Sequence, residues 1–111
     1  MAKTKGVLGE ELARTYLESR GLATRERTYR TEYGEIDLIM QDQDVLVFVE
    51  VKYRASDRYG NPLEAVSPRK QAKLKQIARR YIAQLGYEPV CRFDVIGILG
   101  TEIYWVKGAF E

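Results

Sequence analysis

The chain has 111 residues, of which 45% are hydrophobic and 31% are charged, and its formal net charge is +2. This length and composition predict one globular domain over residues 1–111 with a single modest core. The small charge does not by itself indicate a nucleic-acid partner. With no histidine and one cysteine, the sequence excludes imidazole catalysis, histidine-ligated zinc and an intramolecular disulfide.

Neither a membrane helix nor a signal peptide is predicted. No stretch approaches the roughly 20 apolar residues that a membrane span needs, and residues 1–20 contain no apolar run. The single cysteine, Cys91, suits a reducing compartment, so we expect a cytoplasmic protein with no membrane partner. Its neighbours Val90 and Phe93 predict the start of a strand, and therefore a buried, unreactive thiol.

The first predicted element is an amphipathic helix over residues 6–20. Leu8, Leu12 and Leu17 recur at helical spacing. Gly21 is suited to end this helix, because glycine readily adopts the left-handed conformation of a C-terminal cap.

Three strands are predicted next. Residues 22–30 carry a charged cluster, which is typical of an edge strand. Residues 34–40 form the second strand, residues 42–44 the turn, and residues 45–53 the third strand. Four valines at alternating positions give the third strand one fully apolar face.

The remaining elements complete an α/β pattern. Residues 55–66 show no period, and about twelve such residues are typical of a binding loop. Ser67 followed by proline predicts the start of a helix that runs to about Leu85. Strands are expected over 91–99 and 102–107. The order α-β-β-β-α-β-β predicts a central mixed sheet flanked by helices.

The second and third strands carry the main functional signal. Strand side chains alternate between faces, so Glu35 shares a face with Asp37, and Glu50 shares a face with Lys52. If the two strands pair as a hairpin, Asp37, Glu50 and Lys52 can meet. Carboxylates suit Mg²⁺ or Mn²⁺, and the carbonyl of Val51 could add a ligand. Lys52 would orient the attacking water, deprotonate it or neutralise the transition state.

The alternative interpretation is a solvated ion pair on the sheet surface. It fits poorly because Glu50 and Lys52 follow the apolar Phe48 on the same face. Two carboxylates about 4 Å apart repel by roughly 4 kcal/mol at an effective dielectric of 20, so a fold needs a reason to keep them together. We therefore favour a functional role for this cluster. Glu35 is left open between the site and a pairing with an arginine.

Motifs across nearly the whole chain resemble a known family. The matching segments are Gly9-Glu10-Glu11-Leu12-Ala13, Gly34 to Ile39, Val47 to Arg54, Lys70 and Arg92-Phe93-Asp94-Val95. They resemble the PD-(D/E)XK nuclease superfamily near its Holliday-junction resolvases, and most closely the bacterial YraN-type proteins, regarded as endonuclease candidates. The resemblance implies a restriction-endonuclease-like fold, metal and catalytic roles for Asp37, Glu50 and Lys52, and an accessory metal role for Glu10.

Several polar residues are candidates for contacts with nucleic acid. Arg54 and Lys70 could hold phosphates, and Gln71 could position water or substrate, but ordinary surface polarity explains them equally well. Asp94 lies among apolar residues and is expected to pair structurally. A basic face on the second helix is more commonly just solvated; it comprises Arg69, Lys73, Arg79 and Arg80. Four tyrosines could stack on bases or simply pack: Tyr29, Tyr33, Tyr53 and Tyr59.

Three functions compete on this basis. The first is a metal-dependent endonuclease acting on DNA, including branched or structured DNA, for which a resolvase would need a homodimer. The second is a nucleic-acid-binding module with the same fold and little activity of its own, acting with a partner. The third is a small scaffold protein, which leaves the acidic cluster unexplained.

Overall fold

The computed structural model describes residues 5–54 and 66–111, so all but the end of the predicted 55–66 loop lies outside the described residues. The observed elements follow the predicted order α-β-β-β-α-β-β. They are α1 (Lys5–Ser19), β1 (Ala23–Thr31), β2 (Gly34–Asp42), β3 (Val45–Arg54), α2 (Pro68–Ala83), β4 (Val90–Leu99) and β5 (Glu102–Phe110).

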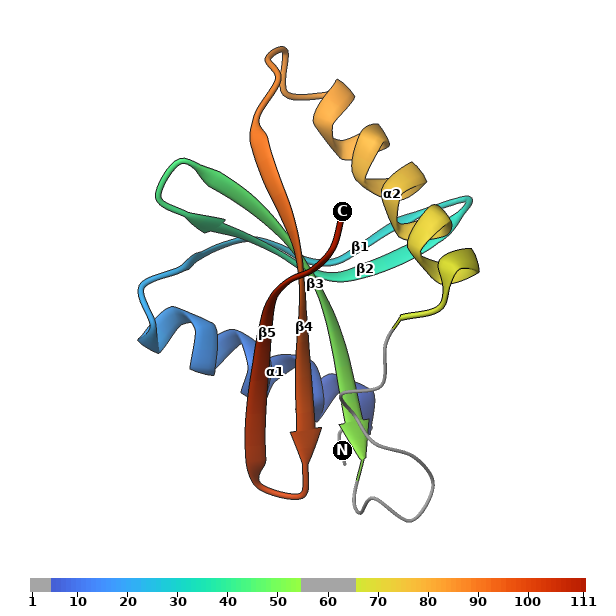
Figure 1. Cartoon of the computed structure of the whole chain (residues 1–111). Coiled ribbons are helices and arrows are strands. Elements are labelled where there is room, and N and C mark those ends of the chain that lie inside the picture. The colour runs from blue at the N-terminus through green and yellow to red at the C-terminus, as the bar shows by residue number, and fades with distance from the viewer. Residues whose placement is uncertain (1–4, 55–65) are drawn as a thin grey trace.

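The sheet has five strands in the order β1-β2-β3-β4-β5. β3 and β4 are parallel, and each other neighbouring pair is antiparallel. A parallel pair needs a crossover, and α2 lies in the connection from β3 to β4. α2 packs mainly over β2 and α1 mainly over β3, on opposite sides of the fanned strands (Figure 1). The predicted mixed sheet flanked by helices is therefore confirmed.

Alternation along β3 builds a core on each side of the sheet. Leu46 and Phe48 belong to the cluster under α2, whereas Val47 and Val49 belong to the cluster under α1. All four side chains are buried. The apolar valine face predicted for this strand is confirmed, and the opposite face leads from Phe48 directly to Glu50.

The predicted ends of the helices are largely confirmed. Gly21, just after α1, has φ 95°, a left-handed conformation that costs glycine little. The Ser67 side chain accepts a hydrogen bond from the Lys70 N–H at 3.2 Å, which caps α2. α2 ends at Ala83, before the predicted Leu85. The reason is a tighter final turn, in which the Gln84 N–H donates to the Tyr81 carbonyl three residues back.

The prediction of a buried thiol at Cys91 was wrong. Cys91 is exposed. β4 begins at Val90, which is 68% exposed, and the first core residue of that strand is Phe93. The strand therefore starts beyond the cover of the helices. Partial burial and the charge of Glu88 still raise the pKa of the Cys91 thiol.

The buried Asp94 carboxylate pairs with Arg92 within β4 and links β4 to β5 through hydrogen bonds. The Asp94 side chain is fully buried, and Arg92 donates to both of its oxygens, at 2.8 and 2.9 Å. The Trp105 indole N–H and the Gly108 N–H also donate to it, each at 2.9 Å. Gly108 has φ 60° near a register shift in the β4–β5 pairing, and this bond lets β5 continue to Phe110, past the predicted end. The structural role predicted for Asp94 is confirmed.

Neither α1 nor α2 has the length and apolar content that a membrane crossing requires.

Asp94→Ala is expected to destabilise the domain by about 3–5 kcal/mol, because it leaves two N–H donors without their acceptor and the half-buried Arg92 guanidinium with Asp42 alone. Urea unfolding measures this loss. Asp44→Ala, in the exposed turn between β2 and β3, is the matched control and should change the free energy of unfolding by no more than about 0.5 kcal/mol. Equal effects of the two substitutions would contradict the structural role of Asp94.

Candidate metal centre

The candidate centre lies where the pairing of β2 with β3 stops. The ladder runs from Asp42 opposite Val45 to Leu38 opposite Val49 and is not continued at Asp37. At that point the Asp37 carboxylate accepts a hydrogen bond from the Val51 N–H at 2.8 Å. A side chain thus occupies the place of a backbone partner, and the Asp37 carboxylate is held between the two strands.

Side-chain alternation in β2 is interrupted at the same residue. Ile36 belongs to the cluster under α2, whereas Leu38 belongs to the cluster under α1. In a regular strand these two side chains would share one face. The neighbouring β1 has a matching irregularity at Thr28, which lies opposite Asp37 in the register and has φ 47°. The two irregularities together set Asp37 at the boundary between the faces of the sheet.

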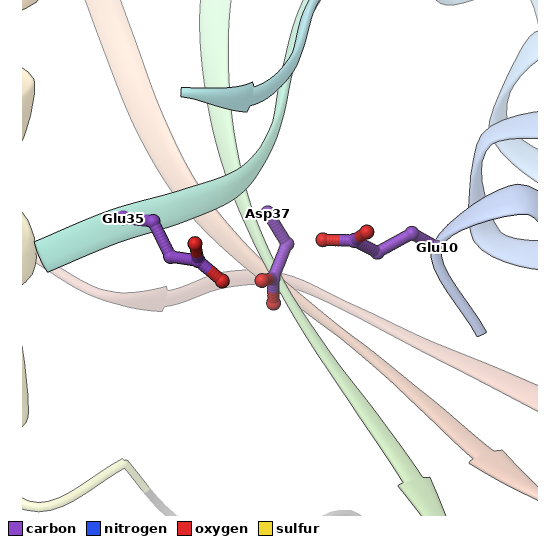
Figure 2. A group of neighbouring side chains, drawn as sticks. All are labelled: Glu10, Glu35 and Asp37. Carbon is purple, nitrogen blue, oxygen red and sulfur yellow. The ribbon is translucent and has the colours of Figure 1, made fainter. Parts of the chain in front are cut away.

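Three carboxylates meet at this place. One carboxylate oxygen from each of Glu10, Glu35 and Asp37 lies within 4.8 Å of the other two. Figure 2 shows Glu10 reaching toward Asp37 from α1, with Glu35 on the other side. Glu35 also accepts a hydrogen bond from Arg30 Nε at 2.9 Å. Glu35 therefore lies beside Asp37 and also pairs with an arginine, and Glu10 reaches Asp37 from α1.

Glu50 approaches the centre from the α2 side. It is only 8% exposed, and Lys70 Nζ lies 2.7 Å from its Oε1. Among the described residues, the three-carboxylate group leaves Glu50 out. Lys70, predicted to hold a phosphate, thus neutralises a carboxylate in this structure. Lys52 follows two residues later on β3 and is half-buried.

The electrostatics of the centre favour a cation. Burial, then the charge of Glu50 and to a lesser extent that of Glu10, raise the pKa of Asp37 to about 8. The Val51 N–H opposes this shift but does not cancel it. A half-buried carboxylate surrounded by like charges is stabilised by a cation. The donors are all carboxylate oxygens, which suit Mg²⁺ or Mn²⁺ better than softer metals.

The residues predicted to contact nucleic acid differ in their surroundings: two donate to backbone carbonyls, and others line a cavity. The Gln71 amide donates to the Val66 carbonyl at 2.8 Å, and Arg54 donates to the Tyr53 carbonyl at 2.9 Å. Lys73 is exposed and, with Ser67, Arg69 and Lys70, lines a cavity of about 300 Å³ at the start of α2. Part of the basic face is therefore gathered into one pocket beside Glu50.

Other members of the predicted binding surface serve structural contacts. Arg80 forms an ion pair with Glu32, at 2.6 Å. The Tyr29 ring packs edge-on against Tyr81, with the ring centroids 5.2 Å apart, which is the packing alternative. Tyr59 lies outside the described residues.

Thr28 contacts the centre and was not among the predicted site residues. Its hydroxyl lies 3.4 and 3.3 Å from the two carboxylate oxygens of Glu10. The sequence marks Thr28 only as a departure from the family that the chain resembles, whose members often have asparagine at this position, and that departure assigned it no role.

The fold and the site together define a class of protein: an α/β domain with a carboxylate cluster at a break in its central sheet. The chain belongs to Uncharacterised protein family UPF0102, whose sequence model matches residues 9–98. The matched segment includes every candidate residue from Glu10 to Lys73.

UPF0102 proteins of several bacteria are similar to the chain over almost its full length. The protein of Herminiimonas arsenicoxydans is 47% identical over 106 residues, covering 96% of this chain and 86% of the relative. That of Nitrosococcus oceani is 42% identical over 115 residues, covering 98% and 93%. That of Shewanella frigidimarina is 45% identical over 105 residues, covering 95% and 97%.

The raised pKa of Asp37 predicts that ionisation of this carboxyl lowers the free energy of unfolding of the metal-free protein as the pH rises. The folded chain keeps this proton up to about pH 8, whereas the unfolded chain loses it near the ordinary value of 3.8. The contribution of Asp37 to stability is therefore complete below pH 3.8 and is lost as the pH rises to about 8.

Asp37→Asn removes this cost and should stabilise the metal-free protein increasingly as the pH rises from 4 toward about 8. The gain is several kcal/mol at most, since one pKa unit corresponds to about 1.4 kcal/mol. Urea unfolding at a series of pH values measures it. The exposed Asp44→Asn is the control, and a difference for Asp37→Asn that is the same at every pH would contradict the raised pKa.

Proposed function

We propose that the protein is a metal-dependent endonuclease that hydrolyses phosphodiester bonds in DNA. The observation that carries the proposal is the Asp37 carboxylate, which is fixed by the Val51 N–H at the end of the β2–β3 ladder. Acidic groups approach it from both faces of the sheet, Glu10 from α1 and Glu50 from β3 under α2. Such a concentration of buried negative charge is typical of a functional site.

The residues present fit a divalent cation with hard oxygen ligands. Asp37 and Glu50 would hold it, with the Val51 carbonyl and Glu10 as further ligands. A bound Mg²⁺ or Mn²⁺ supplies polarisation of the phosphoryl oxygen and a lowered pKa of bound water. The Val51 N–H fixes the orientation of the Asp37 carboxylate at 2.8 Å, so this ligand is already positioned.

The two lysines have separate roles in this proposal. Lys52 lies on the same strand as Glu50 and would orient or deprotonate the attacking water, or neutralise charge in the transition state. Lys70 is 2.7 Å from Glu50 and lines the basic cavity with Arg69 and Lys73. A DNA phosphate in this cavity would therefore lie next to a metal ligand. Arg54 and Gln71 are proposed as outer contacts with the substrate.

The resemblance to PD-(D/E)XK nucleases near the Holliday-junction resolvases supports this assignment. The proposal includes branched or structured DNA as a substrate, a homodimer that would cut two strands, and a cytoplasmic location. The motifs behind the resemblance include three of the proposed metal ligands, Glu10, Asp37 and Glu50.

One contact favours a second candidate function. The Lys70–Glu50 ion pair neutralises a carboxylate that the nuclease would use as a metal ligand. A nucleic-acid-binding module with this fold and little activity of its own would keep such a pair permanently, because the pair offsets the buried charge.

Nicking of plasmid and branched DNA with Mg²⁺ or Mn²⁺ tests the leading proposal. Wild type should cut, whereas Asp37→Asn and Lys52→Ala should reduce the rate at least a hundredfold, about 2.7 kcal/mol of barrier at 1.36 kcal/mol per factor of ten. Asp44→Asn and Lys107→Ala, which change exposed residues outside the centre, are matched controls and should cut like wild type.

Metal-dependent thermal stabilisation separates the two candidates. A ligand specific for the folded state raises stability, by about 2.7 kcal/mol at a hundred times its Kd. The nuclease requires a metal-dependent shift that Asp37→Asn abolishes. DNA binding without cutting and without a metal-dependent shift would instead establish the binding module.

A further inference from the structure

Thr28 has a backbone conformation that its side chain disfavours. Its φ is 47°, and among the described residues Gln43 is the only other non-glycine residue with positive φ. Gln43 lies in the β2–β3 turn, where this conformation is common, but Thr28 lies within β1. A left-handed β-branched residue inside a strand is an outlier, and such outliers concentrate at functional sites.

The left-handed turn places two consecutive side chains on one side of the sheet. Arg27 and Thr28 both line a cavity of about 150 Å³ between α1 and β1. A regular strand would send these neighbours to opposite faces. The conformation of Thr28 therefore brings its hydroxyl to the α1 side, opposite Asp37 in the register.

At this position the hydroxyl contacts Glu10. Thr28 Oγ1 lies 3.3 Å from one carboxylate oxygen and 3.4 Å from the other, so its proton can be donated to either. Glu10 is the ligand of the candidate centre that comes from a separate element, and its carboxylate reaches Asp37 from α1. A contact with both oxygens restricts the orientation of the whole carboxylate.

The same cavity offers Glu10 competing partners. Arg14 lies one helical turn after Glu10 on α1, at the spacing that favours ion pairs, and Arg27 lies next to Thr28. The Arg14 Nε is buried and has no hydrogen-bond partner among the described residues. Arg14 Nη1 pairs with Glu18 at 3.2 Å, so the Nε is the atom that Glu10 could satisfy. A Glu10 carboxylate that turned toward this Nε or toward Arg27 would leave Asp37.

We propose that Thr28 is a positioning residue of the metal centre, whose hydroxyl holds Glu10 toward Asp37 and away from the arginines of this cavity. The left-handed backbone conformation of Thr28 directs its hydroxyl toward α1. This inference rests on the proposed metal centre. It adds that Thr28, which is not itself a ligand, sets the orientation of the ligand Glu10. Partners that orient a ligand typically change metal affinity by about 10–100-fold.

The test is the Kd of the full chain for Mn²⁺, measured by isothermal titration calorimetry. Thr28→Val keeps the β-branched shape and removes the hydroxyl, and it should weaken binding about tenfold, the lower end of the usual range for an orienting partner. Thr28→Ser keeps the hydroxyl and should bind within about twofold of wild type. Unfolding midpoints without metal check that each variant is folded.

A second substitution tests the competition directly. Adding Arg14→Gln to Thr28→Val removes one rival partner of Glu10 and should recover part of the lost affinity. Lys107→Gln, at an exposed position of β5, is the control and should recover none.

The outcomes distinguish the role of Thr28 from the existence of the metal centre. If wild type binds Mn²⁺ and the valine variant binds equally tightly, the role of Thr28 is overturned and the metal centre stands. If the serine variant is as weak as the valine variant, the hydroxyl is not the cause and the inference fails. If wild type binds no Mn²⁺, the metal centre and the role of Thr28 within it both fail.

Discussion

The hydrogen bond from the Val51 N–H to the Asp37 carboxylate is the constraint on which the centre depends. Antiparallel strands normally continue pairing through their backbones, and an unpaired buried N–H is costly. Here a side chain satisfies the donor, so β2 can leave β3 without that cost. The separation of the strands leaves a carboxylate between them, where burial and the charge of Glu50 raise its pKa to about 8.

Groups from both faces of the sheet converge on this position. α1 contributes Glu10 on one side, while on the other side β3 contributes Glu50, which contacts Lys70 at the start of α2. The position of each helix is set by its hydrophobic cluster, so packing energy holds the acidic groups together against their repulsion. A bound cation would relieve that repulsion, which is the physical basis for proposing a metal-dependent reaction.

Much of this arrangement was predictable from the sequence, because periodicity and caps are local signals. The order of the elements followed from them, as did the apolar valine face and the capped start of α2. The contacts of Lys70 with Glu50 and of Thr28 with Glu10 were not predictable, since they join elements far apart in the chain. The exposure of Cys91 was mispredicted because hydrophobic neighbours do not reveal where helix cover ends.

The central claim is that the break in the sheet holds a divalent cation. Its most direct test is a crystal structure with Mn²⁺, in which anomalous scattering locates the ion. An anomalous peak is expected in contact with the carboxylates of Asp37 and Glu50. A crystal grown with Mn²⁺ that shows no peak there, or shows Lys70 still paired with Glu50 and the ion bound elsewhere, would contradict the account.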